Sequence, residues 1–389
     1  MAATDDTGST IMTADQIYLD HNGTTPVATP VAEAMWPYLT EWFGNPSSAT
    51  AEGRIARQGV EHAREQVAAL IGAHPDEIIF TSGGTEANNL ALRGLAVRER
   101  VAVTSAVEHP ATVEPLAYLE SGGWTVHRLG VDAQGRVAAD DVPDTPLGLG
   151  TLILAQNEVG TIQAVADVAA RVHAAGGVMH IDAAQAIGKI PVSVDDLNVD
   201  LLSIAGHKLY APKGVGALYV RRGTSIQPVL VGAGQERQLR PGTENVASIV
   251  GLGAAAELAD ELVESEMPRQ QQLREMLWQQ LSSTIPDVVR ISPADGCLPN
   301  TLMVAIPGHI GADLLEAADT VAASTGSACH SGLHTPAQTL IEMGIEHDVA
   351  LGAIRLSLGR STTEADISTA ADALGDAASK PVVNSSAAN

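Results

Sequence analysis

The chain has 389 residues, of which 46 are acidic and 22 basic, so its formal net charge is −24. Such a surface repels nucleic-acid phosphates and anionic lipid, which argues against direct nucleic-acid binding and against membrane binding. Hydrophobic residues make up 45% of the chain without any apolar run long enough to span a bilayer, so we expect a globular protein.

The first residues, 1–16, are polar and acidic, and they match neither a secretory signal nor an arginine-rich transit peptide. The only two cysteines, Cys297 and Cys329, are too few for a disulfide framework. Both observations favour a reducing, cytoplasmic location.

Helical and strand patterns then alternate as far as residue 220. An amphipathic helix is predicted over 52–72 and another helical segment over 167–175. Short apolar strands are predicted at 77–81, 101–106, 125–129, 151–155, 178–182, 201–205 and 215–220. This order predicts an α/β domain in which helices flank a mostly parallel, seven-stranded sheet, with ligands at the carboxyl ends of the strands.

After about residue 264 the pattern changes. The sequence predicts helices over 269–283, from 312 onward and over 336–343, and strands at 288–291, 301–306, 321–324 and 354–358. These elements indicate a smaller α+β domain. The last residues, 377–389, are small and polar, and we expect them to be disordered.

Lys208 is one of only four lysines and follows the apolar strand 201–205 through a turn at Gly206. An amine in such a turn loses solvation, which lowers its pKa and frees it for imine chemistry. Asp182 ends another apolar strand, 178–182. A lysine that forms an imine and an aspartate on a pyridinium nitrogen are the two protein groups that a pyridoxal phosphate site most needs.

Other polar residues follow predicted strands in the same way. Gly84 and Thr85 lie in a turn before a helix predicted from about residue 87, where backbone amides, the helix dipole and a hydroxyl can bind a phosphate, although a Gly-Gly turn is often only a helix cap. His109, Asn157 and Gln185 each follow a strand. Each alone is compatible with a structural role, and their common position favours a shared site.

Two residues of the second half also carry chemistry. Cys329 lies in a run of small residues beside His330, which favours a mobile loop and a thiolate over the alternative of a small buried hydrophobe. Cys297 has no comparable setting. Arg355 is a charged residue within an apolar strand and needs an anion, and a substrate carboxylate held in bidentate fashion would serve.

With these segments together, the chain resembles the cysteine desulfurases, which belong to the class V aminotransferase family of fold-type I pyridoxal phosphate enzymes. The resemblance extends from residue 18 to about residue 361. The motifs that carry it lie at 43–48, 81–89, 108–110, 157–160, 182–185, 206–208, 242–245 and 326–329.

The resemblance implies a homodimer that holds pyridoxal 5'-phosphate on Lys208 as an internal aldimine, with Asp182 on the ring nitrogen. His109 would stack on the ring and act in catalysis, while Asn157 and Gln185 would contact the ring oxygen and the neighbouring edge. The phosphate ligands that it implies are Gly84, Thr85, His207 and, from the second subunit, Thr243. No metal is expected.

For the substrate, L-cysteine, the resemblance implies that Arg355 binds the carboxylate, with Asn157 nearby. Cys329 would accept the sulfur as a persulfide, leave alanine behind, and pass the sulfur to an acceptor protein for iron–sulfur assembly, tRNA thiolation or a thio-cofactor pathway. The domains that it implies are an N-terminal segment 17–30 packed on the small domain, a large domain 31–264, and a small domain 265–376 that carries the cysteine loop.

Three positions depart from the family pattern. Gly23 stands where alanine is usual and would loosen a loop on the substrate side, and Gln156 replaces the first asparagine of a usual pair. Ala205 lacks a serine hydroxyl for the phosphate, a loss of about 0.5–1.5 kcal/mol.

Two alternatives stay open. The segment 328–331, Ala-Cys-His-Ser, also resembles that of the selenocysteine lyases, which favours a lyase on the same scaffold. The departures would suit a scaffold that binds pyridoxal phosphate without catalysis, but retention of Lys208, Asp182, His109, Cys329 and Arg355 argues against it. The acidic surface favours an acceptor protein with a basic face.

Overall fold

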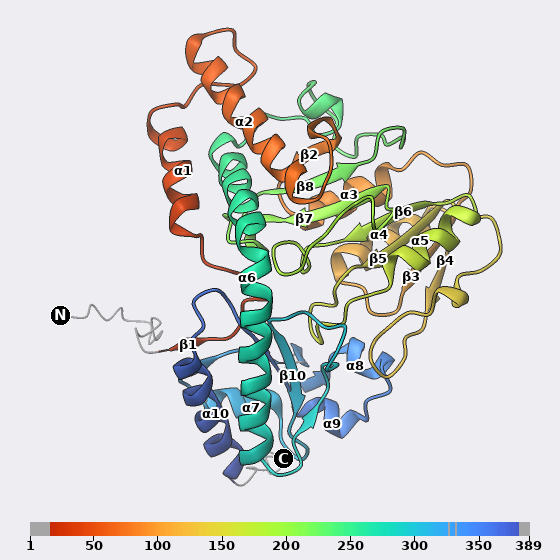
Figure 1. The fold of residues 1–389 in the computed structure, drawn as a ribbon. Coiled ribbons are helices and arrows are strands. Elements are labelled where there is room, and N and C mark those ends of the chain that lie inside the picture. The colour runs from red at the N-terminus through yellow and green to blue at the C-terminus, as the bar shows by residue number, and fades with distance from the viewer. Residues whose placement is uncertain (1–15, 326, 331–332, 381–389) are drawn as a thin grey trace.

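The computed structural model describes residues 16–325, 327–330 and 333–380, and the side chains of residues 327–330, 333 and 334 lie outside that description. Figure 1 shows an upper part, built around a large sheet, and a lower part with a smaller sheet. One long helix, α6 (Val246–Thr284), runs through both.

The large sheet has seven strands in the order β2-β8-β7-β6-β5-β3-β4. Its strands are β2 (Ile78–Thr81), β3 (Val101–Ser105), β4 (Thr125–Leu129), β5 (Leu149–Ile153), β6 (Val178–Asp182), β7 (Leu201–Ala205) and β8 (Gly216–Val220). Only β8 is antiparallel to its neighbours, β2 and β7. The predicted α/β class with a mostly parallel sheet is therefore confirmed.

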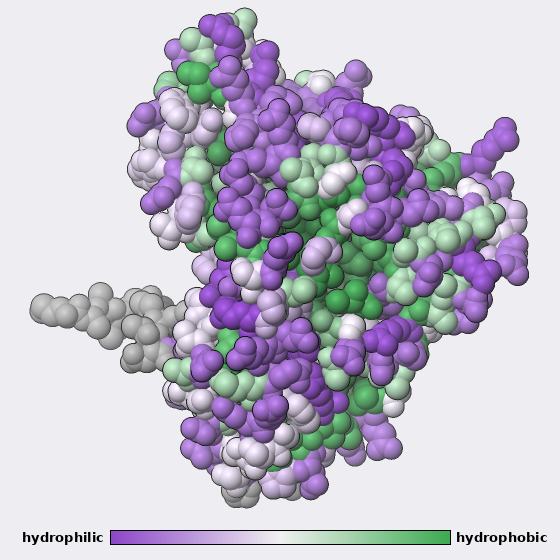
Figure 2. All heavy atoms as spheres, viewed as in Figure 1, coloured by the Kyte–Doolittle hydropathy of each residue, from purple (hydrophilic) through white to green (hydrophobic). Residues whose placement is uncertain are grey.

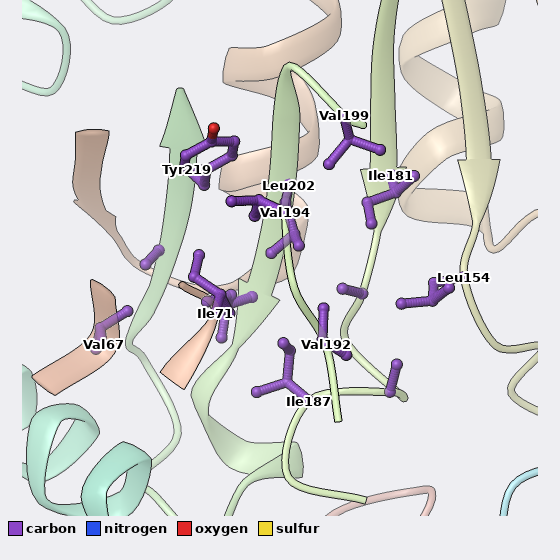
Figure 3. Packing of buried hydrophobic residues seen from close by; sticks show 14 of the residues in the cluster. Val67, Ile71, Leu154, Ile181, Ile187, Val192, Val194, Val199, Leu202 and Tyr219 are labelled. Atoms are coloured by element: carbon purple, nitrogen blue, oxygen red, sulfur yellow. The ribbon is translucent and has the colours of Figure 1, made fainter. Parts of the chain in front are cut away.

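Helices cover this sheet because their apolar stripes need a partner. They are α1 (Thr29–Thr40), α2 (Ala51–Leu70), α3 (Gly84–Gly94), α4 (Pro110–Ser121) and α5 (Val165–Ala174). Figure 3 shows Val67 of α2 and the adjacent Ile71 facing Leu202 of β7 and Tyr219 of β8, and all four side chains are buried. This packing holds β7, whose carboxyl end leads to Lys208. Single 3-10 turns lie at Pro75–Glu77, Ala139–Asp141, Gly206–Lys208 and Glu236–Gln238.

The prediction of a separate helix over residues 269–283 was wrong, because these residues form only the second half of α6. The helix continues through residue 264 because it buries apolar residues at both ends. Its first half buries Leu252 and Ala256 in the core of the large sheet, and its second half buries Leu273 and Leu277 in the core of the smaller sheet.

The smaller sheet is antiparallel, with the order β12-β15-β10-β9. Its strands are β9 (Val289–Arg290), β10 (Thr301–Ala305), β12 (Ser324–Thr325) and β15 (Ala353–Ser357), and a hairpin of β13 (Ser327–His330) and β14 (Leu333–Pro336) lies between them in sequence. The accompanying helices are α7 (Gly311–Ala317), α8 (Gln338–Glu342), α9 (His347–Leu351) and α10 (Glu364–Ser379).

The N-terminal strand β1 (Ile17–Tyr18) pairs in parallel with β11 (Val321–Ala322), and Leu19 is buried in the core of the smaller sheet. Helix α10 continues to Ser379, because Leu374 and Ala377 are buried, so the expectation of a disordered tail was wrong at its first residues. Residues 381–389 lie outside the described residues. The division into domains stays a prediction.

The exterior agrees with the acidic composition. Figure 2, which has the same view as Figure 1, shows hydrophilic residues over most of the visible face. Hydrophobic residues gather beside the middle of α6 (Figure 2). Within residues 16–325, 327–330 and 333–380, the structure contains no helix with the length and apolarity needed to cross a bilayer.

A buried ion pair ties the turn Glu236–Gln238 to the large sheet. Glu236 accepts hydrogen bonds from Arg64 at 2.8 and 2.7 Å and from the Phe80 amide at 2.8 Å. Both charged side chains are buried, and the pair holds Glu236, Arg237 and Gln238 in left-handed backbone, with φ of 44°, 55° and 66°.

We expect Glu236→Gln to lower the free energy of unfolding by about 3–5 kcal/mol, because it leaves the Arg64 charge buried without a counter-charge. Urea unfolding followed by circular dichroism measures this change. Asp76→Asn, which breaks the exposed pair with Arg222, serves as the matched control and should have no measurable effect. Equal effects of the two variants would contradict the assignment.

Candidate active site

A cavity of about 300 Å³ opens at the carboxyl ends of the parallel strands. That volume suits a small ligand. Most of the side chains predicted from the sequence line it, and these are Gly84, Thr85, His109, Asn157, Asp182, Gln185, His207, Lys208 and Arg355. The structure therefore brings together residues from both halves of the chain.

Gly84 and Thr85 form the first turn of α3, directly after β2 and the turn at Gly83. The first amides of a helix have no acceptor within it, so this end of the cavity offers free donors and a positive dipole to an anion. A Cβ added to Gly84 would lie 3.2 Å from the Cβ of Ala205. The alanine that replaces the usual serine thus packs closely against the predicted anion site.

His207 lines the same part of the cavity and pairs through Nδ1 with the hydroxyl of Thr24 at 3.1 Å. Burial and, to a smaller extent, the charges of Lys208 and Lys213 together lower the pKa of His207 to about 4. The ring is therefore neutral at pH 7 and can contribute a hydrogen bond, but no charge, to an anion.

Asp182 ends β6 and is buried. Its Oδ2 accepts a hydrogen bond of 2.8 Å from Asn88, and its Oδ1 accepts one of 3.0 Å from the amide of Ala184. These bonds fix the carboxylate in the cavity wall, where it can hold a protonated nitrogen of a ligand.

Lys208 closes the turn after β7, as predicted. Its Nζ donates to the carbonyl of Gly23 at 2.6 Å and to the carbonyl of Asn22. Burial and the charge of Arg355, opposed by Asp20 and Asp182, together lower the pKa of Lys208 to about 8. A substantial fraction of this amine is therefore neutral and nucleophilic near neutral pH.

His109 is the N-cap of α4, and its Nδ1 accepts a hydrogen bond of 3.1 Å from the Ala111 amide. The ring proton of the neutral form is therefore on Nε2. The preceding residue, Glu108, was not predicted. Its Oε1 accepts bonds from Ser105 at 2.6 Å and from the Ile153 amide at 2.9 Å, and burial raises its pKa to about 8.

Gln185 is held by two neighbours that sequence reasoning missed. Its Nε2 donates to the carbonyl of Asn22 at 2.9 Å, and its Oε1 accepts from Lys189 at 2.6 Å. Lys189 also donates to Oδ1 of Asn22 at 2.7 Å, and burial, together with the charges of Lys208 and Arg355, lowers its pKa. The scarcity of lysine in the chain was the available signal for Lys189.

Arg355 on β15 reaches the cavity from the smaller sheet. Its Nη1 donates to the carbonyl of Asn157 at 3.0 Å, and its Nη2 donates to Oδ1 of Asp20 at 2.6 Å. The sequence predicted an anion for this arginine, and the structure shows that Asp20 already supplies one.

Two predicted residues are not part of the described cavity. Thr243 is exposed and is not among the residues that line it. The backbone of Cys329 lies on β13, but its side chain lies outside the described residues. Cys297 is partly buried, with its Sγ 3.5 Å from the carbonyl of Val159, and burial raises its pKa, which disfavours a thiolate.

The donor set of the cavity fits pyridoxal 5'-phosphate. The helix end at Gly84 and Thr85 suits a phosphate, Asp182 suits a protonated ring nitrogen, and Lys208 suits an aldehyde. Gln156 does not contribute to this set, because its Oε1 accepts from the amides of Glu158 and Val159 at 2.6 and 2.8 Å and so holds a turn together.

Comparison with known proteins identifies the family of the chain. Residues 17–369 match the family model of the class V aminotransferases. A cysteine desulfurase from Nostoc sp. is 44% identical over 359 residues, which cover 90% of each chain.

Solved structures agree as well. A NifS-like protein superimposes with a TM-score of 0.87 at 37% identity, covering 93% of this chain and 98% of its own. SspA, solved in complex with cysteine, superimposes with a TM-score of 0.76 at 34% identity, covering 88% and 98%. The chain therefore belongs to the class V aminotransferase family and, within it, to the group of the cysteine desulfurases.

Proposed function

We propose that this protein is a pyridoxal phosphate-dependent cysteine desulfurase, which converts L-cysteine to L-alanine and leaves the sulfur as a persulfide on Cys329. The observation that carries the proposal is the convergence of Lys208, Asp182 and Arg355 on one cavity. This combination provides an amine, a carboxylate and a carboxylate-binding cation, which are the groups that the chemistry of an amino acid on this cofactor requires.

When bound, the cofactor supplies an aldehyde for the amines of the protein and the substrate and a ring that draws electrons from Cα. Gly84, Thr85 and His207 would hold its phosphate, and Asp182 would hold its ring nitrogen. The Nζ of Lys208, with its pKa near 8, removes the α-proton of the substrate. Arg355 orients the substrate through its carboxylate.

Sulfur transfer then needs one nucleophile. The thiolate of Cys329 attacks the sulfur of the substrate, a new S–S bond forms as the C–S bond breaks, and the electron pair stays with Cβ. Protonation of Cβ and return of a proton from Lys208 to Cα complete alanine, so one thiol and one cysteine give one persulfide and one alanine. The outer sulfur of this persulfide then passes to an acceptor protein in the cytoplasm.

The protein is proposed to act as a homodimer. Large apolar residues are exposed around α1 and in the segment after β8, and they include Trp36 at 64%, Phe43 at 75% and Val231 at 90% exposure. Burying such residues favours association. Thr243, which is exposed on its own chain, is proposed to reach the phosphate of the second subunit.

A selenocysteine lyase is the second candidate, favoured by the sequence Ala-Cys-His-Ser at 328–331. The two activities differ in the chalcogen that leaves the substrate. Comparing kcat/KM for cysteine and selenocysteine separates them, because strong rejection of cysteine would favour the lyase.

The direct test incubates the purified protein, loaded with cofactor, with L-cysteine. We expect alanine to form and one persulfide per active cysteine to accumulate, detected by mass spectrometry. Cys329→Ser should lose the persulfide and slow alanine formation about a hundredfold, because a hydroxyl is a poor nucleophile toward sulfur. Cys297→Ser is the matched control and should behave as wild type. Wild-type rates from Cys329→Ser would exclude it as the nucleophile.

A further inference from the structure

We propose that Asp20 is an internal carboxylate that occupies Arg355 in the resting protein, so that the substrate carboxylate binds by displacing it. The proposal rests on the proposed function, because it takes Arg355 as the ligand of the L-cysteine carboxylate. It adds a residue that sets the affinity for amino-acid substrates. It also gives a specific role to Gly23, which the sequence singled out as a departure from the family pattern.

The first argument is the occupancy of the guanidinium. A carboxylate binds arginine in bidentate fashion through two adjacent N–H donors, and Nε with Nη2 form one such edge. The Oδ1 of Asp20 lies 2.6 Å from Nη2 of Arg355. Nη1 is used by the carbonyl of Asn157 at 3.0 Å. Nε is buried and has no acceptor among the described residues.

Asp20 thus takes one donor of this edge and leaves the other unsatisfied. A buried, unsatisfied donor is costly, and a bidentate carboxylate would satisfy both donors at once. Arg355 is 8% exposed, so it has little water to replace a missing acceptor. A substrate that binds Nε and Nη2 together must therefore move Asp20 away.

The second argument is the position of Asp20 in the backbone. Residue 20 forms an isolated parallel bridge with Ser357, two residues after Arg355 on the same strand. The amides of His21 and Ser357 donate to the carbonyls of Ser357 and Leu19 at 3.1 and 2.7 Å. Since the backbone is fixed on both sides, the carboxylate of Asp20 can leave Arg355 only by rotating its side chain.

The third argument is the glycine that closes this turn. The amide of Gly23 donates to the carbonyl of Asp20 at 2.9 Å. A Cβ added to Gly23 would lie 2.3 Å from Oδ2 and 2.9 Å from Cγ of Asp20, which is too close for both groups to stay. Only glycine at position 23 leaves room for the Asp20 carboxylate in its present orientation.

The exchange also keeps one carboxylate charge opposite the Arg355 guanidinium. Asp20 raises and Arg355 lowers the pKa of Lys208, so the Asp20 carboxylate partly offsets the arginine in the absence of substrate. A substrate carboxylate that replaces it brings the same charge to the same cation. The affinity for substrate therefore reflects the difference between two carboxylates at one site.

The test compares wild type with Gly23→Ala and Asp20→Asn in the enzyme loaded with cofactor. The first variant displaces the carboxylate by steric contact, and the second removes its charge. We expect each to lower KM for L-cysteine about tenfold, with the gain falling in KM rather than in kcat. Calorimetric titration with L-alanine, the product, should show a similar decrease in the dissociation constant.

Ethylamine, which is alanine without its carboxylate, is the ligand control and should bind all forms equally. Glu158→Gln is the charge control, because it removes one negative charge from the neighbouring loop without a contact to Arg355. It should leave the dissociation constant of L-alanine at the wild-type value.

The possible negative results distinguish failure of the proposed function from failure of the Asp20 inference. If wild type makes no alanine from cysteine, the proposed function is wrong. If wild type is active but Asp20→Asn and Gly23→Ala leave KM unchanged or raise it, Asp20 positions Arg355 instead of competing for it, and this inference is overturned. A Gly23→Ala protein that fails to fold leaves Asp20→Asn to decide.

Discussion

Replacing Lys208 by alanine is expected to abolish turnover of L-cysteine, with a decrease in kcat of more than about 10⁴-fold. Among the described residues that line the cavity Lys208 is the only lysine, and the nearby buried Lys189 donates to Asn22 and Gln185 instead. The variant should also lose the visible absorption of covalently bound cofactor, which a spectrum of the purified protein measures.

Lys213→Ala is the matched control for this variant. Lys213 is exposed and follows in the same loop, so its loss changes the net charge equally without removing the proposed base. It should keep both the absorption and most of the activity. A Lys208→Ala protein that retained its colour and its turnover would contradict the whole assignment.

The lowered pKa of Lys208 gives a pH dependence. The amine binds an aldehyde only when it is neutral, so covalent capture of pyridoxal phosphate by the cofactor-free protein should rise with pH and be half-maximal near the pKa of about 8. A midpoint near 10.5, the ordinary value, would show that burial does not act on this amine.

The same shift affects stability. Because the pKa of Lys208 is lower in the folded protein, the unfolded chain binds more protons between pH of about 8 and 10.5. The contribution of Lys208 to the free energy of unfolding therefore rises with pH in this window. Below it, protonation of the buried amine favours the unfolded state.

The strands that carry the site could be predicted from the sequence. Each strand of the large sheet was predicted within two residues at either end, because its apolar run is short and bounded by polar turns. The positions of Asp182 and Lys208 followed from these runs, since parallel strands bring their carboxyl ends to one edge. Cofactor chemistry could be predicted for the same reason.

The length of α6 could not be predicted. Its two halves bury their apolar residues in different cores, so the apolar pattern changes in the middle, and Pro268 adds a signal that usually ends a helix. Tertiary packing on both sides overrides this local signal.

The hydrogen-bond partners of the site residues also could not be predicted from the sequence. Asp20 lies 335 positions from Arg355, and Asn22 lies 167 positions from Lys189. No local periodicity reports a hydrogen bond between segments so far apart. The sequence indicated that Arg355 needs an anion, but it could not distinguish a substrate carboxylate from one already present in the chain.

Asp182→Asn is expected to reduce kcat about a thousandfold while leaving the fold intact. The amide oxygen can still accept from one of the two donors, Asn88 or the Ala184 amide, and the side chain keeps its shape, so the geometry of the wall is largely kept. What is lost is the charge opposite the protonated ring nitrogen. Removing one partner of a buried charge pair costs about 3–5 kcal/mol, which corresponds to this decrease in rate if the cost falls on the transition state.

The control for this variant lies at the other end of the same sheet. Asp200 precedes β7 and, like Asp182, accepts hydrogen bonds from a backbone amide, that of Met179 at 2.8 Å, and from a side chain, His173 at 2.8 Å. Asp200→Asn makes the same chemical change far from the carboxyl ends of the strands and should keep kcat near wild type. Single-turnover rates at saturating cysteine compare the two variants. Equal losses would mean that Asp182 supports the sheet and does not act on the cofactor.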